Sequence, residues 1–324
     1  MINIDMNYQH IIWSHDPLPY ENFIHKGFLN SYTINPRITV GLSEYVNLTI
    51  SQAIGVRDMI WEPTDTSIHH RNENTTTNFK IPYNDEIQAK GGVFGDSKIN
   101  LKYLYKDVGM KEGSRVYFGV GLIIPSKAVL RSDPFKKPED IDDIDEWLSG
   151  KYDHRHFSLS NGVYKGSLEL QLFNKRFSNP IFYGVVFNID IPISASKYGY
   201  LPGINYSISS SMILERKSYS EDKFNVLPGG FLYGLTFIGF EEASWNDNPT
   251  PNSKSLMLVP SIGGVWPTNK GSISLSFQKP FFIKGDNIMV GIDTISNDPL
   301  NNKTNAFELI LGYRRNLGYI IPWL

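Results

Sequence analysis

The sequence predicts an all-β fold, a transmembrane antiparallel up-and-down β-barrel of about twelve strands with short periplasmic turns and long outer loops. Three observations point to this class. Apolar and polar side chains alternate along most strand-like segments, the links between the segments alternate in length, and no stretch of the 324 residues has the roughly 18 consecutive apolar residues of a spanning helix. Lipid offers no hydrogen bonds to a free sheet edge, so such a sheet must close on itself.

The alternation is clearest in residues 271–278, GSISLSFQ. Ile273, Leu275 and Phe277 fall on one face of a strand, and the serines and Gln278 fall on the other. Nearly every predicted strand has one polar or glycine face, and the pattern recurs in residues 46–50, 98–106, 116–122, 165–173, 183–191, 204–208 and 305–314. We expect the apolar faces to contact lipid and the polar faces to line a lumen.

The links between strands decide between a barrel and a two-sheet sandwich, because both folds produce alternation. From residue 36 onward, short links alternate with longer ones, and the longest are 57–97, 126–162 and 285–303. All short links therefore fall at one end of the sheet, as in transmembrane barrels. A sandwich with Greek-key crossings has no reason to keep this parity.

Three segments follow from these boundaries. Residues 36–317 form the predicted barrel, residues 1–35 form an N-terminal segment with a first strand somewhere in 6–34, and residues 318–324 form a C-terminal tail. The start of the chain lacks a basic region followed by an apolar one, so no signal peptide is present in this numbering. Whether the N-terminal segment plugs the lumen is left open.

Composition excludes several classes of protein. The net charge of −2 and pI near 6.4 give no electrostatic footprint for nucleic acid. The chain has no cysteine, which excludes disulfides and thiolate metal sites. Aromatic residues make up 13% of the chain, and such residues also collect at membrane interfaces.

The polar faces supply the candidate lumen residues. Acids, bases and amides are mixed among them, so one sign of charge does not dominate and no ion preference is predicted. Twelve strands enclose a narrow lumen that side chains or an inward-folded loop can fill. The candidates are Lys98, Asn100, Lys102, Glu169, Gln171, Asn188, Asp190, Asn205, Ser274, Gln278, Glu308 and Arg314.

Two segments contain residue types that also occur in enzymatic or metal sites. Residues 154–162, HRHFSLSNG, are similar to the His-x-Ser-Asn-Gly signature of outer-membrane phospholipases, but His156 and Ser160 are four residues apart, about 13 Å along a strand. The acidic stretch 138–156 has helical spacing and lacks the pattern of a calcium loop. No catalytic residue, metal ligand or cofactor is predicted.

Several segments resemble one family of outer-membrane barrels, in the family's own order over roughly residues 36–317. They are GGVFGDSKINLKYLYK (91–106), VYFGVGLIIPS (116–126), the hairpin from 159 to 191, LMLVPSIGGVWPTNKGSISLSFQKPFF (256–282) and FELILGYRRNL (307–317). The family is the meta-pathway-of-phenol-degradation transporter family, loosely akin to the long-chain fatty-acid channel. The resemblance implies a channel for small, often hydrophobic, molecules.

The leading hypothesis is therefore an outer-membrane channel or binding pore of a Gram-negative bacterium for small solutes, hydrophobic or aromatic ones included, and not an enzyme. A rival is a non-conducting structural barrel that docks an envelope protein through its long loops, because loops 57–97 and 126–162 are long enough to form an interface. A lipid hydrolase is the third alternative. The expected partners are the lipid bilayer and a small-molecule solute, with an envelope protein in the rival hypothesis.

Overall fold

The computed structural model describes residues 1–15, 25–62, 93–109, 111–129, 158–217, 226–250, 253–284 and 303–317. Sixteen strands occur in this part of the chain. They are β1 (Ile2–His15), β2 (His25–Gly41), β3 (Val46–Glu62), β4 (Phe94–Lys106), β5 (Gly113–Ile124), β6 (Lys165–Lys175), β7 (Phe182–Pro192), β8 (Tyr200–Leu201), β9 (Asn205–Glu215), β10 (Gly230–Phe240), β11 (Ser244–Trp245), β12 (Asn248–Pro249), β13 (Ser255–Thr268), β14 (Gly271–Gln278), β15 (Phe281–Lys284) and β16 (Lys303–Arg315).

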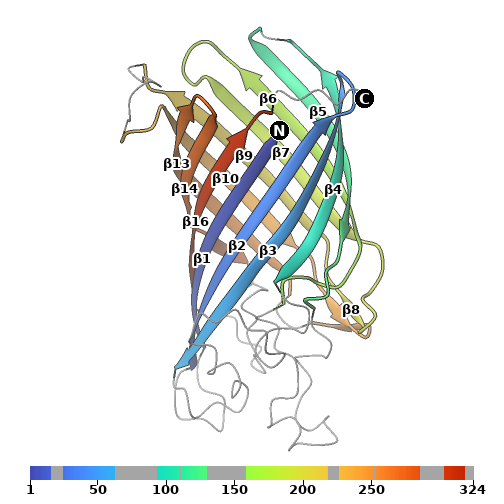
Figure 1. Cartoon of the computed structure of the whole chain (residues 1–324). Coiled ribbons are helices and arrows are strands. Elements are labelled where there is room, and N and C mark those ends of the chain that lie inside the picture. The colour runs from blue at the N-terminus through green and yellow to red at the C-terminus, as the bar shows by residue number, and fades with distance from the viewer. Residues whose placement is uncertain are drawn as a thin grey trace, which may run out of the picture.

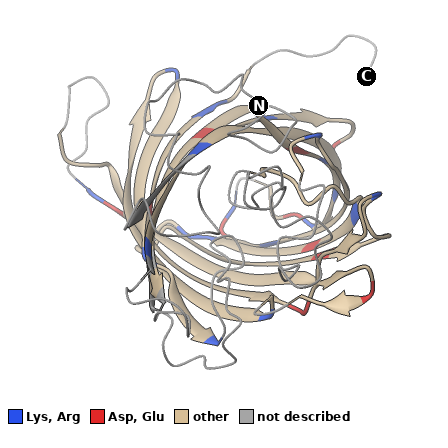
Figure 2. Ribbon diagram, turned by 90° about the horizontal axis from the view of Figure 1, so that it is seen from below, with Lys and Arg blue, Asp and Glu red and all other residues tan. Residues whose placement is uncertain are grey.

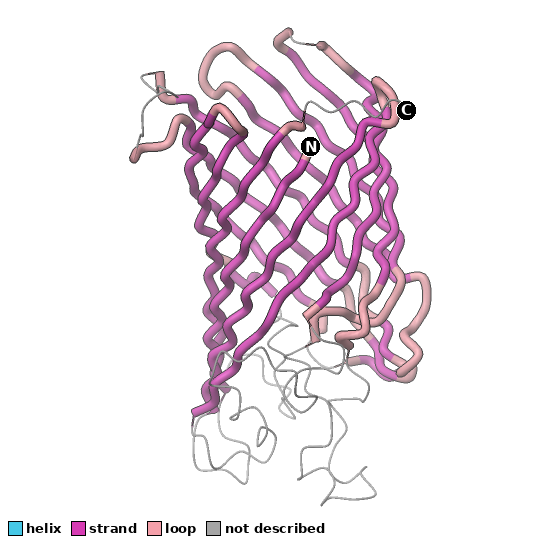
Figure 3. Tube along the Cα trace, in the orientation of Figure 1, coloured by secondary structure: helices cyan, strands magenta, loops and turns pink. Residues whose placement is uncertain are grey.

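The main sheet closes into a twelve-stranded antiparallel barrel, which confirms the predicted fold class (Figures 1 and 3). Each long strand pairs with its neighbour in sequence, β16 pairs with β1, and β10 pairs with β13. Both β14 and β15 pair with β13 on the same side, so they are two parts of one wall strand that is interrupted at Lys279 and Pro280. Within the described residues, each long strand of the wall has a paired neighbour on both sides along at least part of its length.

The two ends of the barrel differ as the link lengths predict. At one end lie the short links 42–45, 107–112, 176–181 and 269–270, together with the longer link 216–229. Ile2 of β1 pairs with both Arg315 of β16 and Ile38 of β2, so the barrel's first and last strands also begin and end there. The links at the other end include 63–93 and 125–164, most of which fall outside the described residues.

The N-terminal region contributes more to the wall than the sequence pattern indicates. Residues 1–35, expected to hold one uncertain strand ahead of a barrel that starts at residue 36, contain all of β1 and most of β2. Both strands are paired along their lengths. Residues 2–15 therefore lie in the barrel wall and do not fill the lumen.

The outward face of the wall is apolar over most of its height. Leu168 is 52% exposed and Leu275 is 45% exposed, although both lie within regular strands. Soluble monomers rarely expose a continuous apolar surface of this extent. A transmembrane barrel has such an apolar band where its wall contacts lipid. Its exposed members include Ile99, Leu101, Phe118, Val120, Leu172, Ile189, Ile208, Leu235, Phe237, Ile262, Ile273, Phe277, Leu309 and Leu311.

Part of the link between β5 and β6 folds against the inner wall at the end with long links. The backbone N–H groups of Leu159 and Ser160 donate to the carbonyl of Ala128, which joins residues 126–129 to 158–160. Arg57 of β3 donates to the carbonyl of Ser158, and the side chain of Asp96 on β4 accepts from the N–H of Ser126. This inward turn (residues 126–129 and 158–160) narrows the lumen on the side of β3 and β4.

A small sheet at the same end joins two neighbouring links. It consists of β8, β11 and β12, and the rings of Tyr200 and Trp245 lie 5.2 Å apart across it. Trp245 is buried. Among the described residues there is no helix that is long and apolar enough to cross a membrane. The short helix expected within residues 138–156 falls entirely outside the described ranges.

Candidate functional site: a charged cavity inside the barrel

The pairing register of three consecutive strands, β4, β5 and β6, positions the first residues of the candidate site. Lys102 of β4 pairs with Gly119 of β5, and Gly119 pairs with Glu169 of β6. The three residues therefore form one transverse row on the inner face of the wall. Because Gly119 has no side chain, Lys102 and Glu169 face each other directly across the strand that separates them.

Glu169 is the centre of a polar cluster. Its Oε1 lies 2.5 Å from Lys102 Nζ, and Asn100 Nδ2 donates to its Oε2 at 3.3 Å. Gln171, two residues along the same strand, donates its amide to Oε1. The side chain of Glu169 is only 10% exposed, so these donors replace most of the water that the carboxylate would otherwise bind.

Two further ion pairs lie on the same inner wall. Lys98 Nζ of β4 lies 3.5 Å from Asp190 Oδ1 of β7, which shows that both side chains project to the concave side. Arg37 Nη2 of β2 lies 3.2 Å from Asp5 Oδ2 of β1. Together with Lys102 and Glu169, these residues form three ion pairs, in each of which one cation contacts one carboxylate.

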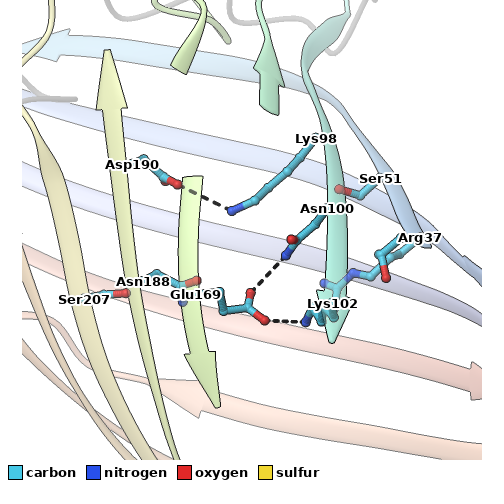
Figure 4. A pocket seen from close by; sticks show the side chains of 10 residues that line it. Arg37, Ser51, Lys98, Asn100, Lys102, Glu169, Asn188, Asp190 and Ser207 are labelled. Atoms are coloured by element: carbon cyan, nitrogen blue, oxygen red, sulfur yellow. Dashed lines mark hydrogen bonds and ion pairs between the residues drawn. The ribbon is translucent and has the colours of Figure 1, made fainter. Parts of the chain in front are cut away.

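These side chains surround a cavity of about 300 Å³ within the barrel (Figure 4). Figure 2, in which the barrel is seen from below, shows the strands as a closed ring. Each of the ten side chains that line the cavity carries a polar group. They are Arg37, Thr49, Ser51, Lys98, Asn100, Lys102, Glu169, Asn188, Asp190 and Ser207.

The structure brings half of the twelve candidate lumen residues to this cavity, namely Lys98, Asn100, Lys102, Glu169, Asn188 and Asp190. Gln171 contacts the cluster through Glu169, and Asn205 is paired with Asp190 in the ladder. The other four lie on the inner face of the opposite wall, where Ser274 pairs with Gly312, Gln278 with Glu308, and Ser272 with Arg314. Their participation in a solute pathway stays a prediction.

Four cavity residues were absent from the candidates. Arg37, Thr49 and Ser51 lie on β2 and β3, and Ser207 lies on β9. The sequence contains the signal for Thr49, Ser51 and Ser207, because each continues the polar period of its strand. Arg37 follows Pro36, the residue at which the predicted barrel begins.

An aromatic group also lies on the inner face, nearer the short turns. The ring of Phe173 is 6.1 Å from that of Tyr117 and 5.3 Å from that of Phe182. Gly184 makes room for it, because a Cβ there would come within 2.4 Å of the Phe173 ring. Phe173 lies two residues beyond Gln171 and four beyond Glu169 on β6. Because side chains alternate between the two faces of a strand, its ring lies on the inner face with them.

Neither chemical alternative gains support from the described residues. His156 lies outside them, and the hydroxyl of Ser160 is buried and accepts the backbone N–H of Gly162 at 3.0 Å. Within the described ranges, no group of three or more His, Asp or Glu side chains could hold a metal ion. The inner wall instead presents paired charges around a cavity, inside a barrel with an apolar exterior.

This combination is the architecture of an outer-membrane-type barrel. The fold is similar to that in the crystal structure of the COG4313 outer membrane channel from Pseudomonas putida F1, with a TM-score of 0.53 and 12% identity, over 97% of this chain and 94% of that chain. A FadL homologue from Pseudomonas aeruginosa (TM-score 0.42, 9% identity, 96% and 89% covered) and the TodX monoaromatic hydrocarbon channel (TM-score 0.39, 8% identity, 98% and 90% covered) are more distant. No family model matches the chain, and no curated protein matches it significantly. Membership of the phenol-degradation transporter family therefore stays a prediction.

Proposed function

We propose that this protein is an outer-membrane channel of a Gram-negative bacterium that passes small solutes through its lumen. The observation that carries the proposal is the contrast between the two faces of one closed wall. Large aliphatic and aromatic side chains are exposed outside, while paired charges and small polar residues surround a cavity inside. A soluble protein has its polar groups outside and its apolar groups inside, which is the reverse arrangement.

Aromatic side chains with polar ends on the outer wall support membrane insertion. Tyr8 and Tyr32 have ring centroids 5.1 Å apart, and His10 lies 5.3 Å from Phe307. Tyr8 Oη donates to Asn30 Oδ1 at 3.1 Å, and His10 Nδ1 lies 2.7 Å from the same oxygen. Rings of this kind are enriched where a barrel wall passes through the boundary between lipid and water.

Reconstitution of the purified protein into planar lipid bilayers tests the proposal. We expect discrete conductance steps in potassium chloride, because water and ions can enter a lumen lined by hydrated polar groups. A protein that inserts, as shown by a folded band that shifts on boiling in a denaturing gel, but never conducts would contradict the channel and favour the structural barrel.

The balance of charge predicts weak ion selectivity that one substitution would change. With Glu169→Gln, the cavity would have one excess positive charge, since Lys102 would lose its partner. We expect the reversal potential in a tenfold potassium chloride gradient to shift toward that of chloride. Glu44→Gln is the matched control, because Glu44 lies in the exposed link between β2 and β3. Equal shifts in the two variants would show that Glu169 does not face the ion path.

The position of Gly119 predicts that a larger side chain there would obstruct the ion path through the lumen. A Cβ there would lie 3.0 Å from Glu169 Cβ and 3.2 Å from Asn100 Oδ1, so the branched side chain of Gly119→Val would displace the cluster and narrow the lumen. We expect lower single-channel conductance. Gly166→Val is the control, because a Cβ at Gly166 has no neighbour within 4 Å. An unchanged conductance in Gly119→Val would place the main path elsewhere.

A further inference from the structure

The residues that line the cavity also indicate the class of solute that it binds. This inference rests on the proposed function. We propose that the cavity binds a small, uncharged, polyhydroxylated solute of about monosaccharide size. The argument has three steps, which concern the unpartnered acceptors in the wall, the paired charges and the size of the space.

Buried acceptors without partners line the cavity. Asn100 is only 5% exposed, and its Nδ2 donates to Glu169, yet its Oδ1 has no hydrogen-bond partner. Asn188 Oδ1 is buried and equally without a partner. An unpaired buried carbonyl oxygen costs free energy unless a donor reaches it. Neither oxygen is exposed to the cavity in this arrangement, so a rotation of the side chain would bring it to the hydroxyl donor of a bound solute.

The charged residues favour a neutral solute over an ionic one. Lys98 and Lys102 each contact a carboxylate inside the cavity, and Arg37 contacts Asp5 beside it. An anion would have to displace these carboxylates or lie against them. The lysine and arginine N–H groups that face the cavity can still donate to the oxygen of a neutral hydroxyl, because each group has more donors than its ion pair uses.

The lining does not suit a hydrocarbon or an aromatic ring. None of the ten described residues around the cavity has an aromatic or purely aliphatic side chain, so a ring would find no surface on which to stack. Ser51 and Ser207 offer hydroxyls that can each donate and accept, and the Thr49 hydroxyl already forms a hydrogen bond with that of Thr39 at 3.1 Å. The volume of about 300 Å³ lies at the small end of ligand sites, which run from about 300 to 1,000 Å³.

Current block in planar bilayers tests the inference with three probes of different chemistry. Glucose represents the neutral polyol, gluconate adds a carboxylate, and phenol represents an aromatic compound with one hydroxyl. We expect glucose to reduce the ion current saturably and at lower concentration than gluconate or phenol. A glucose effect that rises linearly with concentration, or tighter block by gluconate or phenol, would overturn the proposal while leaving the channel itself intact.

The substitution Asn188→Val shows whether glucose blocks the current by binding at this cavity. It removes the unpartnered oxygen, and we expect glucose to bind about three- to tenfold more weakly, as for the loss of one or two hydrogen bonds. Asn7→Val is the matched control, because Asn7 is an inner-face residue of β1 with an equally buried, unpartnered Oδ1 that does not line the cavity. Equal weakening in both variants would refute binding at this cavity.

A protein that inserts without conducting would refute the proposed function but still permit a test of binding. Equilibrium dialysis of the full chain, folded in detergent, against labelled glucose then gives the result directly. Saturable binding that is weakened by Asn188→Val and kept by Asn7→Val supports the inference. Absence of saturable binding in the folded protein contradicts it.

Discussion

Deletion of residues 1–15 is expected to abolish folding into membranes. These residues contain β1, which hydrogen-bonds to β16 on one side and to β2 on the other. Both neighbours run antiparallel to β1 and hence parallel to each other, so they cannot re-pair in the native antiparallel manner. Two long edges would then face lipid with unpaired N–H and C=O groups, each costing several kcal/mol.

The readout is the folded band that shifts on boiling after refolding into lipid vesicles, compared with the full chain under the same conditions. We expect the band to disappear in the deletion variant. If residues 1–15 instead plugged the lumen, the shortened protein would still fold and would conduct more than the full chain. That result would overturn the assignment of β1 to the wall.

The second large effect concerns the two faces of single strands. Leu170 lies on the outer face midway along β6, and Leu275 lies on the outer face of β14. Replacing either with Arg should lower the free energy of unfolding by about 2 to 4 kcal/mol if the position is near the bilayer midplane, because the guanidinium would lie in hydrocarbon. The measurement is denaturant unfolding in lipid vesicles.

The neighbouring inner-face residues are the matched controls. Gln171→Arg would place its charge beside Glu169, and Ser274→Arg would place its charge near Asp5, since both Ser274 and Asp5 approach Gly312. We expect much smaller losses of stability in these two variants. Equal losses in all four variants would indicate a sheet that is buried on both faces, and a one-residue shift in register would exchange the two results.

The wall was predictable because its physical determinants are local. A period of two follows from strand geometry alone, so Leu168, Leu172, Ile273 and Leu275 could be assigned to the outer face without any knowledge of their neighbours. The alternation of short and long links then favoured a barrel over a sandwich. The region before residue 36 was less clear, because β1 and β2 mix aromatic, amide and histidine side chains on their outer faces.

The cavity was less predictable because it depends on contacts between distant strands. The alternation of side chains along β4 and β6 placed Lys98, Lys102 and Glu169 on inner faces. It could not show that Lys102 contacts Glu169 across β5, or that Lys98 contacts Asp190 across two strands. The role of Gly119 depends on the pairing register of three strands. The alternation of side chains along each strand does not determine that register alone, because turns and bulges also contribute. The inward turn depends on tertiary hydrogen bonds and leaves no repeating signal in the sequence.

Single-cysteine labelling along β6 tests the central claim, that one closed wall separates lipid from a water-filled lumen. The chain has no cysteine, so one introduced in turn at positions 168 to 172 is the sole thiol in each variant. Each variant is inserted into lipid vesicles and treated with a charged, membrane-impermeant thiol reagent. The structure predicts rapid labelling at positions 169 and 171 and protection at 168, 170 and 172. Uniform labelling along the strand, or protection at 169 and 171 with labelling at the other three, would contradict it.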